Sequence, residues 1–184
     1  MRAGILSGIL FLLACNHPES EELTENQNYK LSFEDERISS PVISEVKEYY
    51  EVIGVKDGDT IVLLIDGAAK TVRLSHIDCP EKKQPFGNRA KQFVSDMCFG
   101  KNVAIESDGK ADRDGRLIAE ILLEEGINLN KEIVKAGLAW HYKKFSTDSE
   151  YADLEIAAQK AQLGLWIDEN PIAPWEWRKI SKKK

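Results

Sequence analysis

The sequence has little histidine and little cysteine, three residues of each among 184. His76 and His141 could suggest zinc held together with a nearby acid or thiol, but no zinc-ligand spacing supports such a site. We therefore expect both histidines to have structural roles, at the surface or in the core. The sequence also has no internal repeats, which excludes a solenoid of stacked units.

Long hydrophobic runs are lacking as well, because the apolar run Ile5–Leu13 is too short for a comfortable transmembrane helix. Arg2 precedes this run and Cys15 follows it, so residues 1–15 have the pattern of an export signal whose end resembles the bacterial lipobox. In a lipobox the cysteine is lipidated and becomes the new N-terminus. We expect an exported, membrane-anchored lipoprotein of the cell envelope, with lipid on Cys15. The alternatives are an ordinary signal peptide with a secreted product, and a cytoplasmic chain with a mis-assigned start.

With Cys15 assigned to a lipid, Cys79 and Cys98 are the cysteines left to pair in an exported protein. Cys98 falls on the apolar face of an expected helix, where cysteine behaves as a small core residue. Cys79 belongs to an acidic loop. We expect no disulfide between them.

An excess of positive charge, the usual mark of a nucleic-acid partner, is absent from the whole chain, whose net charge is −6. The negative charge is concentrated near the front, since residues 16–50 carry nine acidic and three basic side chains. From Glu51 onward, 22 acidic and 21 basic side chains nearly balance. Residues 16–48 are polar, acidic and aperiodic, which is typical of a disordered tether. The overall charge therefore says little about the partner of the following domain, and a bound cation could neutralise several of its acids.

Five short strands are predicted from β-branched or alternating segments between turn residues. Asp57-Gly58 and Asp66-Gly67 have the pattern of hairpin turns, so the first three strands form a meander. Asp59 shares a face with Ile61 and Leu63 by the period of two. The predicted strands are Tyr50–Lys56, Thr60–Ile65, Ala69–Ser75, Lys101–Glu106 and Arg116–Leu123.

Three helices are predicted among and after these strands. An apolar stripe from Phe86 to Cys98 indicates an amphipathic helix that ends before Gly100. A second helix is expected at about Asn128–Ala136, and a third begins at a capping box, Thr147–Glu150.

This order of elements favours an α+β fold built on a small closed barrel. The five-stranded oligonucleotide/oligosaccharide-binding barrel (OB-fold) with three helices is the leading candidate, and another α+β fold is the alternative. The domain is expected to span residues 49–170, followed by an aromatic and basic tail at 171–184. We expect the four tryptophans to serve packing.

Four charged residues lie around the second and third predicted strands: Asp59, Arg73, Asp78 and Glu81. Because the third strand returns antiparallel to the second, the loop after it could bring Asp78 and Glu81 near Asp59. Clustered carboxylates repel one another unless a cation lies among them, and oxygen-only ligands on irregular loops suit Ca²⁺ better than Mg²⁺. An arginine beside such a site suggests a bound phosphate and phosphodiester chemistry. The alternative is two solvated turns with one salt bridge at a strand end.

Five segments, in order, closely resemble the staphylococcal nuclease (thermonuclease) family: "DGDT", "VRLSHIDCPE", "FGNRAKQFV", "DRDGR" and "GLAW". The resemblance covers about Tyr49 to Trp166 with compatible spacing, and the joint signal is much more specific than any one segment. It implies the five-stranded OB-fold barrel with three helices. It also implies a calcium-dependent nuclease that cuts DNA and RNA and leaves 3′-phosphate ends.

The resemblance assigns roles around the cation. Asp59 and Asp78 match the two carboxylate ligands. Cys79 stands where the family archetype has a threonine that offers its backbone carbonyl, a role that tolerates the exchange. Glu81 matches the glutamate that orients or deprotonates the attacking water; the resemblance leaves both roles open.

The resemblance also assigns the phosphate contacts. Arg73 and Arg116 match the two arginines that hold the reacting phosphate, and the alternative for Arg116 is an ordinary surface residue. Arg113 and Asp114 replace a lysine–tyrosine pair of the archetype, while Tyr142 corresponds loosely to a nucleotide-contacting tyrosine. We retain Arg113 and Tyr142 as substrate contacts, although these differences leave base preference open.

The competing function is a catalytically inactive barrel that binds nucleic acid or protein. Such domains of this family typically lose the carboxylates or the arginines, whereas all five functional side chains are present here. We therefore expect a monomeric Ca²⁺-dependent nuclease with DNA and RNA as substrates and a membrane as its anchoring partner.

Overall fold

A computed structural model of the protein describes residues 48–124 and 126–182. Cys15, the predicted export signal and all but the last residue of the predicted tether lie outside these residues. Within the described ranges, no helix is both long and apolar enough to cross a membrane.

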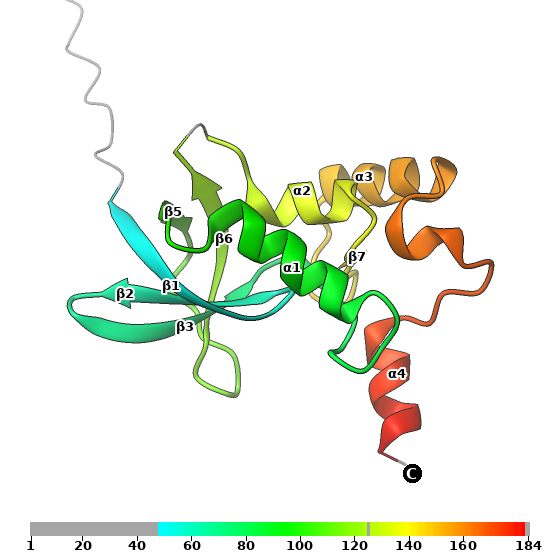
Figure 1. The fold of residues 1–184 in the computed structure, drawn as a ribbon, viewed down its shortest axis with the longest axis horizontal. Coiled ribbons are helices and arrows are strands. Elements are labelled where there is room, and N and C mark those ends of the chain that lie inside the picture. Colours follow the sequence, from blue (N-terminus) through cyan, green and yellow to red (C-terminus); the bar gives the residue numbers. More distant parts are fainter. Residues whose placement is uncertain (1–47, 125, 183–184) are drawn as a thin grey trace, which may run out of the picture. The chain divides into compact units, whose positions relative to one another are not determined.

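Five strands close into a barrel in the order β1-β2-β3-β6-β5 (Figure 1). Neighbouring strands are antiparallel except β3 and β6, which run parallel. The closed barrel confirms the predicted α+β OB-fold architecture. The strands are β1 (Tyr49–Asp57), β2 (Thr60–Ile65), β3 (Ala68–Leu74), β5 (Asn102–Glu106) and β6 (Leu117–Leu123).

The barrel interior is filled by alternate apolar residues of its strands, including Ile61, Leu63, Val72 and Ile121, all with no exposed surface. Asp59 is also buried, as expected from the face it shares with Ile61 and Leu63. Asp59 is therefore an acid at the end of the inward-facing row that continues with Ile61 and Leu63. Such a group needs partners, because an unpaired buried charge is costly.

The described residues contain four α-helices, one more than predicted: α1 (Gly87–Cys98), α2 (Leu129–Lys135), α3 (Ser149–Lys160) and α4 (Pro174–Ser181). Helix α4 forms within the segment expected to be a tail, with Pro174 at its start, where the fixed φ of proline favours a helix. The capping residue of α3 is also corrected. Asp148 accepts the hydrogen bond of Glu150 N, so the cap is one residue later than Thr147.

Two short strands outside the barrel, β4 (Ile77–Asp78) and β7 (Trp140–His141), pair antiparallel and hold the segment after β3 in place. His76 Nδ1 and His141 Nε2 both lie within hydrogen-bond distance of Ser146 Oγ, at 2.9 and 2.8 Å. The predicted structural roles of both histidines are thus confirmed. A 3-10 turn, η1 (Gly164–Ile167), follows α3.

Both cysteines of the domain, Cys79 and Cys98, are buried and free in the structure. Cys98 packs on the inner side of α1, where its thiol donates to the carbonyl of Val94 at 3.1 Å. Burial raises the pKa of the Cys98 thiol to about 12. Cys79 lies beside the buried acids, and burial raises the pKa of its thiol well above the usual value.

Candidate active site

The turn between β1 and β2 is tied to the segment after β3 through Asp59. The backbone N–H of Leu74 donates to the carbonyl of Asp59 at 2.9 Å. In the side chain, Asp59 Oδ2 accepts from Cys79 N at 2.8 Å, and Oδ1 accepts from Thr60 Oγ1 at 3.1 Å. These bonds bring the predicted metal-binding acids Asp59 and Asp78 to one end of the barrel.

Arg73 joins the two acids. It lies opposite Thr60 in the β2–β3 register, and its Nη2 is 3.1 Å from Asp59 Oδ2 and 3.0 Å from Asp78 Oδ1. The same guanidinium donates to the carbonyls of Leu74 and Ile77, at 2.7 and 2.9 Å. With a side chain that is 14% exposed, Arg73 is embedded among acceptors.

Two acids at this end of the barrel, Asp78 and Asp57, have raised pKa values. Burial raises the pKa of Asp78 above its usual value, and the charge of Asp59 acts in the same direction, while Arg178 and Arg73 partly offset the rise. Burial and the charge of Asp59 also raise the pKa of Asp57 to about 6. The arrangement would therefore gain from a further positive charge.

Arg116 reaches the same cluster from the turn that leads into β6. Its Nε and Nη2 both lie 2.7 Å from Asp112 Oδ2, which fixes the guanidinium, and its Nη1 donates to Thr60 Oγ1 at 3.3 Å. Since Thr60 donates to Asp59, the hydroxyl connects the second predicted phosphate-binding arginine to the first acid. Sequence reasoning missed this bridging role of Thr60, although its position next to Asp59 in "DGDT" was visible.

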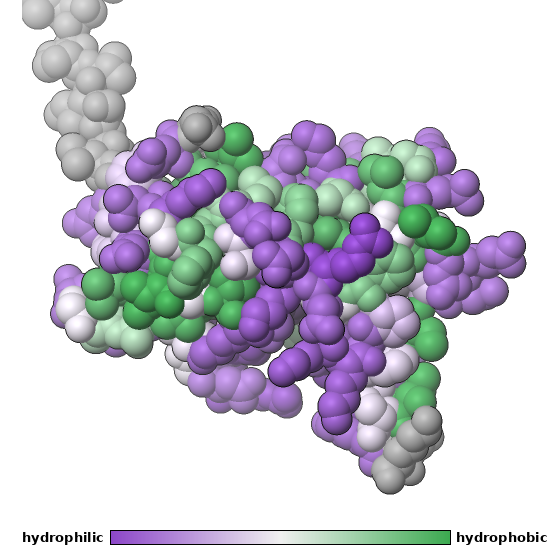
Figure 2. All heavy atoms as spheres, viewed as in Figure 1, coloured by the Kyte–Doolittle hydropathy of each residue, from purple (hydrophilic) through white to green (hydrophobic). Residues whose placement is uncertain are grey.

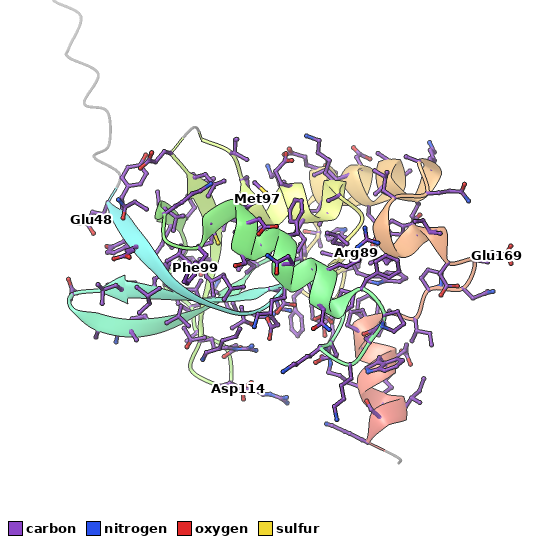
Figure 3. The ribbon with its side chains drawn as sticks, in the orientation of Figure 1. Glu48, Arg89, Met97, Phe99, Asp114 and Glu169 are labelled. Carbon is purple, nitrogen blue, oxygen red and sulfur yellow. The ribbon has the colours of Figure 1, made fainter. Side chains whose placement is uncertain are left out.

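A groove of about 760 Å³ opens beside Arg116, and Lys56 and Lys70 also line it, together with the acids Asp57 and Asp114. Asp114 lies at the tip of the loop between β5 and β6 (Figure 3). Its neighbour Arg113, predicted to contact substrate, has a side chain that is 91% exposed, with a carboxylate oxygen of Asp114 3.8 Å away. Three basic side chains in the lining give the groove groups that can contact a phosphate backbone.

Glu81 contacts an arginine that the sequence reading did not select. Arg178 of α4 donates from Nη1 to Glu81 Oε1 at 2.8 Å and from Nη2 to Asp78 Oδ2 at 2.6 Å. Hydrophilic side chains cover the face between the barrel and α4 (Figure 2). A sequence signal for Arg178 was present. Pro174 is typical of a helix start, and in a helix that begins there Trp175 and Arg178, three residues apart, share one face.

The predicted base contact Tyr142 is also engaged by α4. The rings of Tyr142 and Trp175 stack at 5.3 Å between centroids with an interplanar angle of 10°. Trp175 also makes an edge contact with Trp140 at 5.6 Å. The expected packing role of Trp175 is confirmed.

Across the described parts of the chain, no three His, Cys, Asp or Glu side chains form a group that could hold a metal ion. The predicted ligand set needs only two side-chain carboxylates, Asp59 and Asp78, with the backbone carbonyl of Cys79. Both carboxylates are buried, and the charge of Asp59 raises the pKa of Asp78. A hard cation bound by oxygen would offset this repulsion, so the chemistry of these residues fits a hard cation.

Comparison with known proteins agrees with this geometry. A family model described as staphylococcal nuclease homologue matches residues 71–168. A protein of Haemophilus influenzae named an uncharacterized endonuclease is 41% identical over 140 residues, which are 76% of this chain and 78% of that protein. A Shigella flexneri protein named micrococcal nuclease is 36% identical over 142 residues, 72% of this chain and 81% of its own length. The chain belongs to the staphylococcal nuclease family.

Proposed function

We propose that this member of a nuclease family is a Ca²⁺-dependent endonuclease that hydrolyses DNA and RNA and leaves 3′-phosphate ends. The observation that carries the proposal is the linked cluster in which Arg73 joins Asp59 to Asp78, and Thr60 joins Asp59 to Arg116. Two acids and two arginines at one end of an OB-fold barrel bring together groups that bind a cation and groups that bind a phosphate.

The cation site comprises Asp59, Asp78 and the backbone carbonyl of Cys79. A cation held by these groups would supply neutralisation of negative charge at the scissile phosphate and polarisation of a water molecule. The protein holds the carboxylates ready for this role, because Cys79 N and Thr60 Oγ1 each fix one oxygen of Asp59. Fixed ligands lose little freedom when the site is filled.

The remaining groups act on substrate and water. Arg73 and Arg116 bind the non-bridging phosphate oxygens, and their charge is most effective in the five-coordinate transition state, where negative charge is greatest. Glu81 orients the attacking water or accepts its proton. The leaving oxygen is the 5′ oxygen of the next nucleotide, so the phosphate stays on the 3′ end.

The groove beside Arg116 supports a polymeric substrate. Lys56 and Lys70 line it together with Arg116, so a strand whose phosphate lies at the arginines would find further cations along its path. The balanced charge of the domain outside the N-terminal segment is consistent with this local attraction.

The second candidate function is an inactive barrel that binds nucleic acid or protein. The contacts of Arg178 with Asp78 and Glu81 favour it, because an internal ion pair can stabilise the fold without catalysis. A full set of acids and arginines favours the nuclease. Binding of DNA with no cleavage in Ca²⁺ would identify the second candidate.

The chemistry of the product ends tests the proposed reaction. The full chain is incubated with a 5′-labelled single-stranded oligonucleotide in Ca²⁺, in Mg²⁺ or in chelator. We expect cleavage in Ca²⁺, weak cleavage in Mg²⁺ and none in chelator. The products should change mobility after treatment with a 3′-phosphatase. Products with 3′-hydroxyl ends, or full activity in chelator, would contradict the proposal.

We also propose that the protein is exported and anchored to a membrane by lipid on Cys15. The support is the apolar run Ile5–Leu13 followed by the lipobox-like end, with the acidic segment 16–48 as a tether. The test is to fractionate cells that express the chain and its Cys15→Ser variant. The parent should be in the membrane fraction and carry acyl mass, and the variant should not. A parent that is wholly free of membrane and unlipidated would contradict this proposal.

A further inference from the structure

Helix α4 contacts two parts of the candidate active site at once. Its Arg178 pairs with Asp78 and Glu81, and its Trp175 stacks on Tyr142. The first two are the predicted cation ligand and water-orienting acid, and the third is the predicted base contact. Figure 1 shows α4, in red, beside the loop that leads from β4 to α1.

The Arg178 guanidinium donates hydrogen bonds to both carboxylate oxygens of Asp78. Nη2 lies 2.6 Å from Oδ2, and Nη1 lies 3.3 Å from Oδ1, which also accepts from Arg73. A positive charge in this place repels a cation that approaches the same carboxylate. Arg178 and a divalent cation therefore compete for Asp78.

Glu81 is drawn into the same contact, since its Oε1 accepts from Arg178 Nη1 at 2.8 Å. An oxygen that accepts from the guanidinium must give up this contact before it can accept a proton from water. Trp175 meanwhile covers one face of the Tyr142 ring in nearly parallel stacking, the arrangement that a nucleic-acid base would adopt there. One helix thus places a positive charge at the cation ligand and an aromatic ring at the base contact.

The attachment of α4 is limited enough to be reversible. The helix has eight residues, too few to be stable without tertiary contacts. Ala173 and Pro174 are buried at its start, and Gln84 Nε2 donates to the carbonyl of Ile172 at 2.5 Å. Beyond Pro174, three residues of the helix, Trp175, Trp177 and Arg178, are half-buried, and the others are exposed. Elements with such sparse burial open at low free energy.

We propose that α4 is an autoinhibitory helix, whose Arg178 and Trp175 occupy the active site until a cation and a nucleic-acid strand displace them. The proposal rests on the proposed nuclease function. In the closed state Asp78 and Glu81 share the single positive charge of Arg178. In the open state the two acids are released to the cation and to water, and the Tyr142 ring is free to stack on a base.

Cation binding tests this competition directly. Ca²⁺ is titrated calorimetrically into the full chain, its Arg178→Gln variant and its Lys179→Gln variant. Lys179 is the matched control, since its substitution removes the same charge from the same helix, and its ion pair within the described residues is with Glu176. We expect Arg178→Gln to bind Ca²⁺ about tenfold more tightly than the parent, and Lys179→Gln to bind as the parent does. Unchanged or weaker binding by Arg178→Gln would overturn the proposal.

Two further readouts do not depend on catalysis. Amide hydrogen exchange at residues 175–181 should become faster when Ca²⁺ is added to the parent, because α4 leaves the acids. In chelator, a fluorescent single-stranded oligonucleotide should bind Arg178→Gln more tightly than Lys179→Gln. Weaker binding by Arg178→Gln would show that α4 is a substrate contact and would overturn autoinhibition. Cleavage that persists in chelator would instead contradict the calcium assignment of the proposed function, and the oligonucleotide measurement would still decide the role of α4.

Discussion

The carboxylate of Asp59 accepts a hydrogen bond from the backbone N–H of Cys79 at 2.8 Å, although the two residues are far apart in the barrel meander. This bond fixes the β1–β2 turn against the segment that carries Asp78. The backbone next to Asp78 thus helps to hold the two predicted cation ligands near each other.

We predict that Asp59→Asn retains the fold and loses cation binding. Asparagine keeps an acceptor for Cys79 N but removes one of two carboxylate charges, and hard cations depend on that charge. Affinity for Ca²⁺ should fall by about 100-fold or more, with a thermal midpoint near that of the parent, measured by calorimetric titration and thermal unfolding. Asp66→Asn, in the exposed β2–β3 turn, is the control and should bind as the parent does.

The two arginines should respond differently to substitution by lysine. Arg116→Lys loses the planar fork that can bind two phosphate oxygens, and kcat should fall by on the order of 100-fold, or about 3 kcal/mol. Its fold should be retained because the side chain is 30% exposed. Arg73→Lys should lose a similar factor and also stability, since Arg73 donates to two backbone carbonyls and two buried acids.

The measurement for this pair is kcat, KM and thermal midpoint over a range of salt concentration, with Arg89→Lys, an exposed arginine of α1, as the control. A general charge effect would survive the exchange to lysine and weaken with salt. Turnover of Arg116→Lys close to that of the parent would mean that "DRDGR" forms an ordinary surface turn.

Asp57→Asn should stabilise the cation-free protein in a pH-dependent way. Because the pKa of Asp57 is about 6 when folded and near 3.8 when unfolded, the parent loses stability as pH rises between these values. The asparagine of the variant does not ionise, so the variant does not lose stability in this way. Its gain in the free energy of unfolding over the parent should be absent below about pH 4 and reach about 1–2 kcal/mol above pH 6. Denaturant unfolding in chelator from pH 4 to 8 measures it. An advantage that does not change with pH would contradict this assignment.

Gly87→Ala should displace the backbone of Glu81, although Gly87 itself is not a predicted site residue. A Cβ at Gly87 would lie 2.0 Å from the backbone oxygen of Glu81, so the loop must move to accommodate it. We expect a loss of about 1–3 kcal/mol in the free energy of unfolding, together with reduced kcat. Gly54→Ala is the control, because its nearest contact would be Val62 at 3.4 Å. Denaturant unfolding that showed equal stability for the two variants would be the contrary result.

The sequence predicted the barrel well because its signals are local. Turn pairs such as Asp57-Gly58, and alternation in segments such as Thr60–Ile65, specify hairpins without reference to the rest of the chain. The convergence of Asp59 with Asp78 also followed from the antiparallel return of β3. The third-helix cap was wrong by one residue, since Thr147 and Asp148 are both capping residue types and only the backbone path selects between them.

The contacts of α4 could not be predicted in this way. Arg178 lies 100 residues from Asp78 in the sequence, and nothing local to either residue indicates the other. The turn of the chain after η1 brings them together, through buried Ala173 and Pro174. Tyr142 was predicted to contact a base, and in the structure its ring stacks on Trp175. Its role toward a base remains a prediction.

The most direct test of the central claim is the rate at which the full chain cuts plasmid DNA, compared with its Asp78→Asn variant, in Ca²⁺ and in chelator. Asp78 contacts both Arg73 and Arg178 and is a predicted cation ligand. Cation binding at the proposed site should therefore depend on its charge. We predict cleavage by the parent in Ca²⁺, none in chelator, and a loss of about 100-fold or more in the variant. Equal cleavage by parent and variant, or parent cleavage that persists in chelator, would contradict the account.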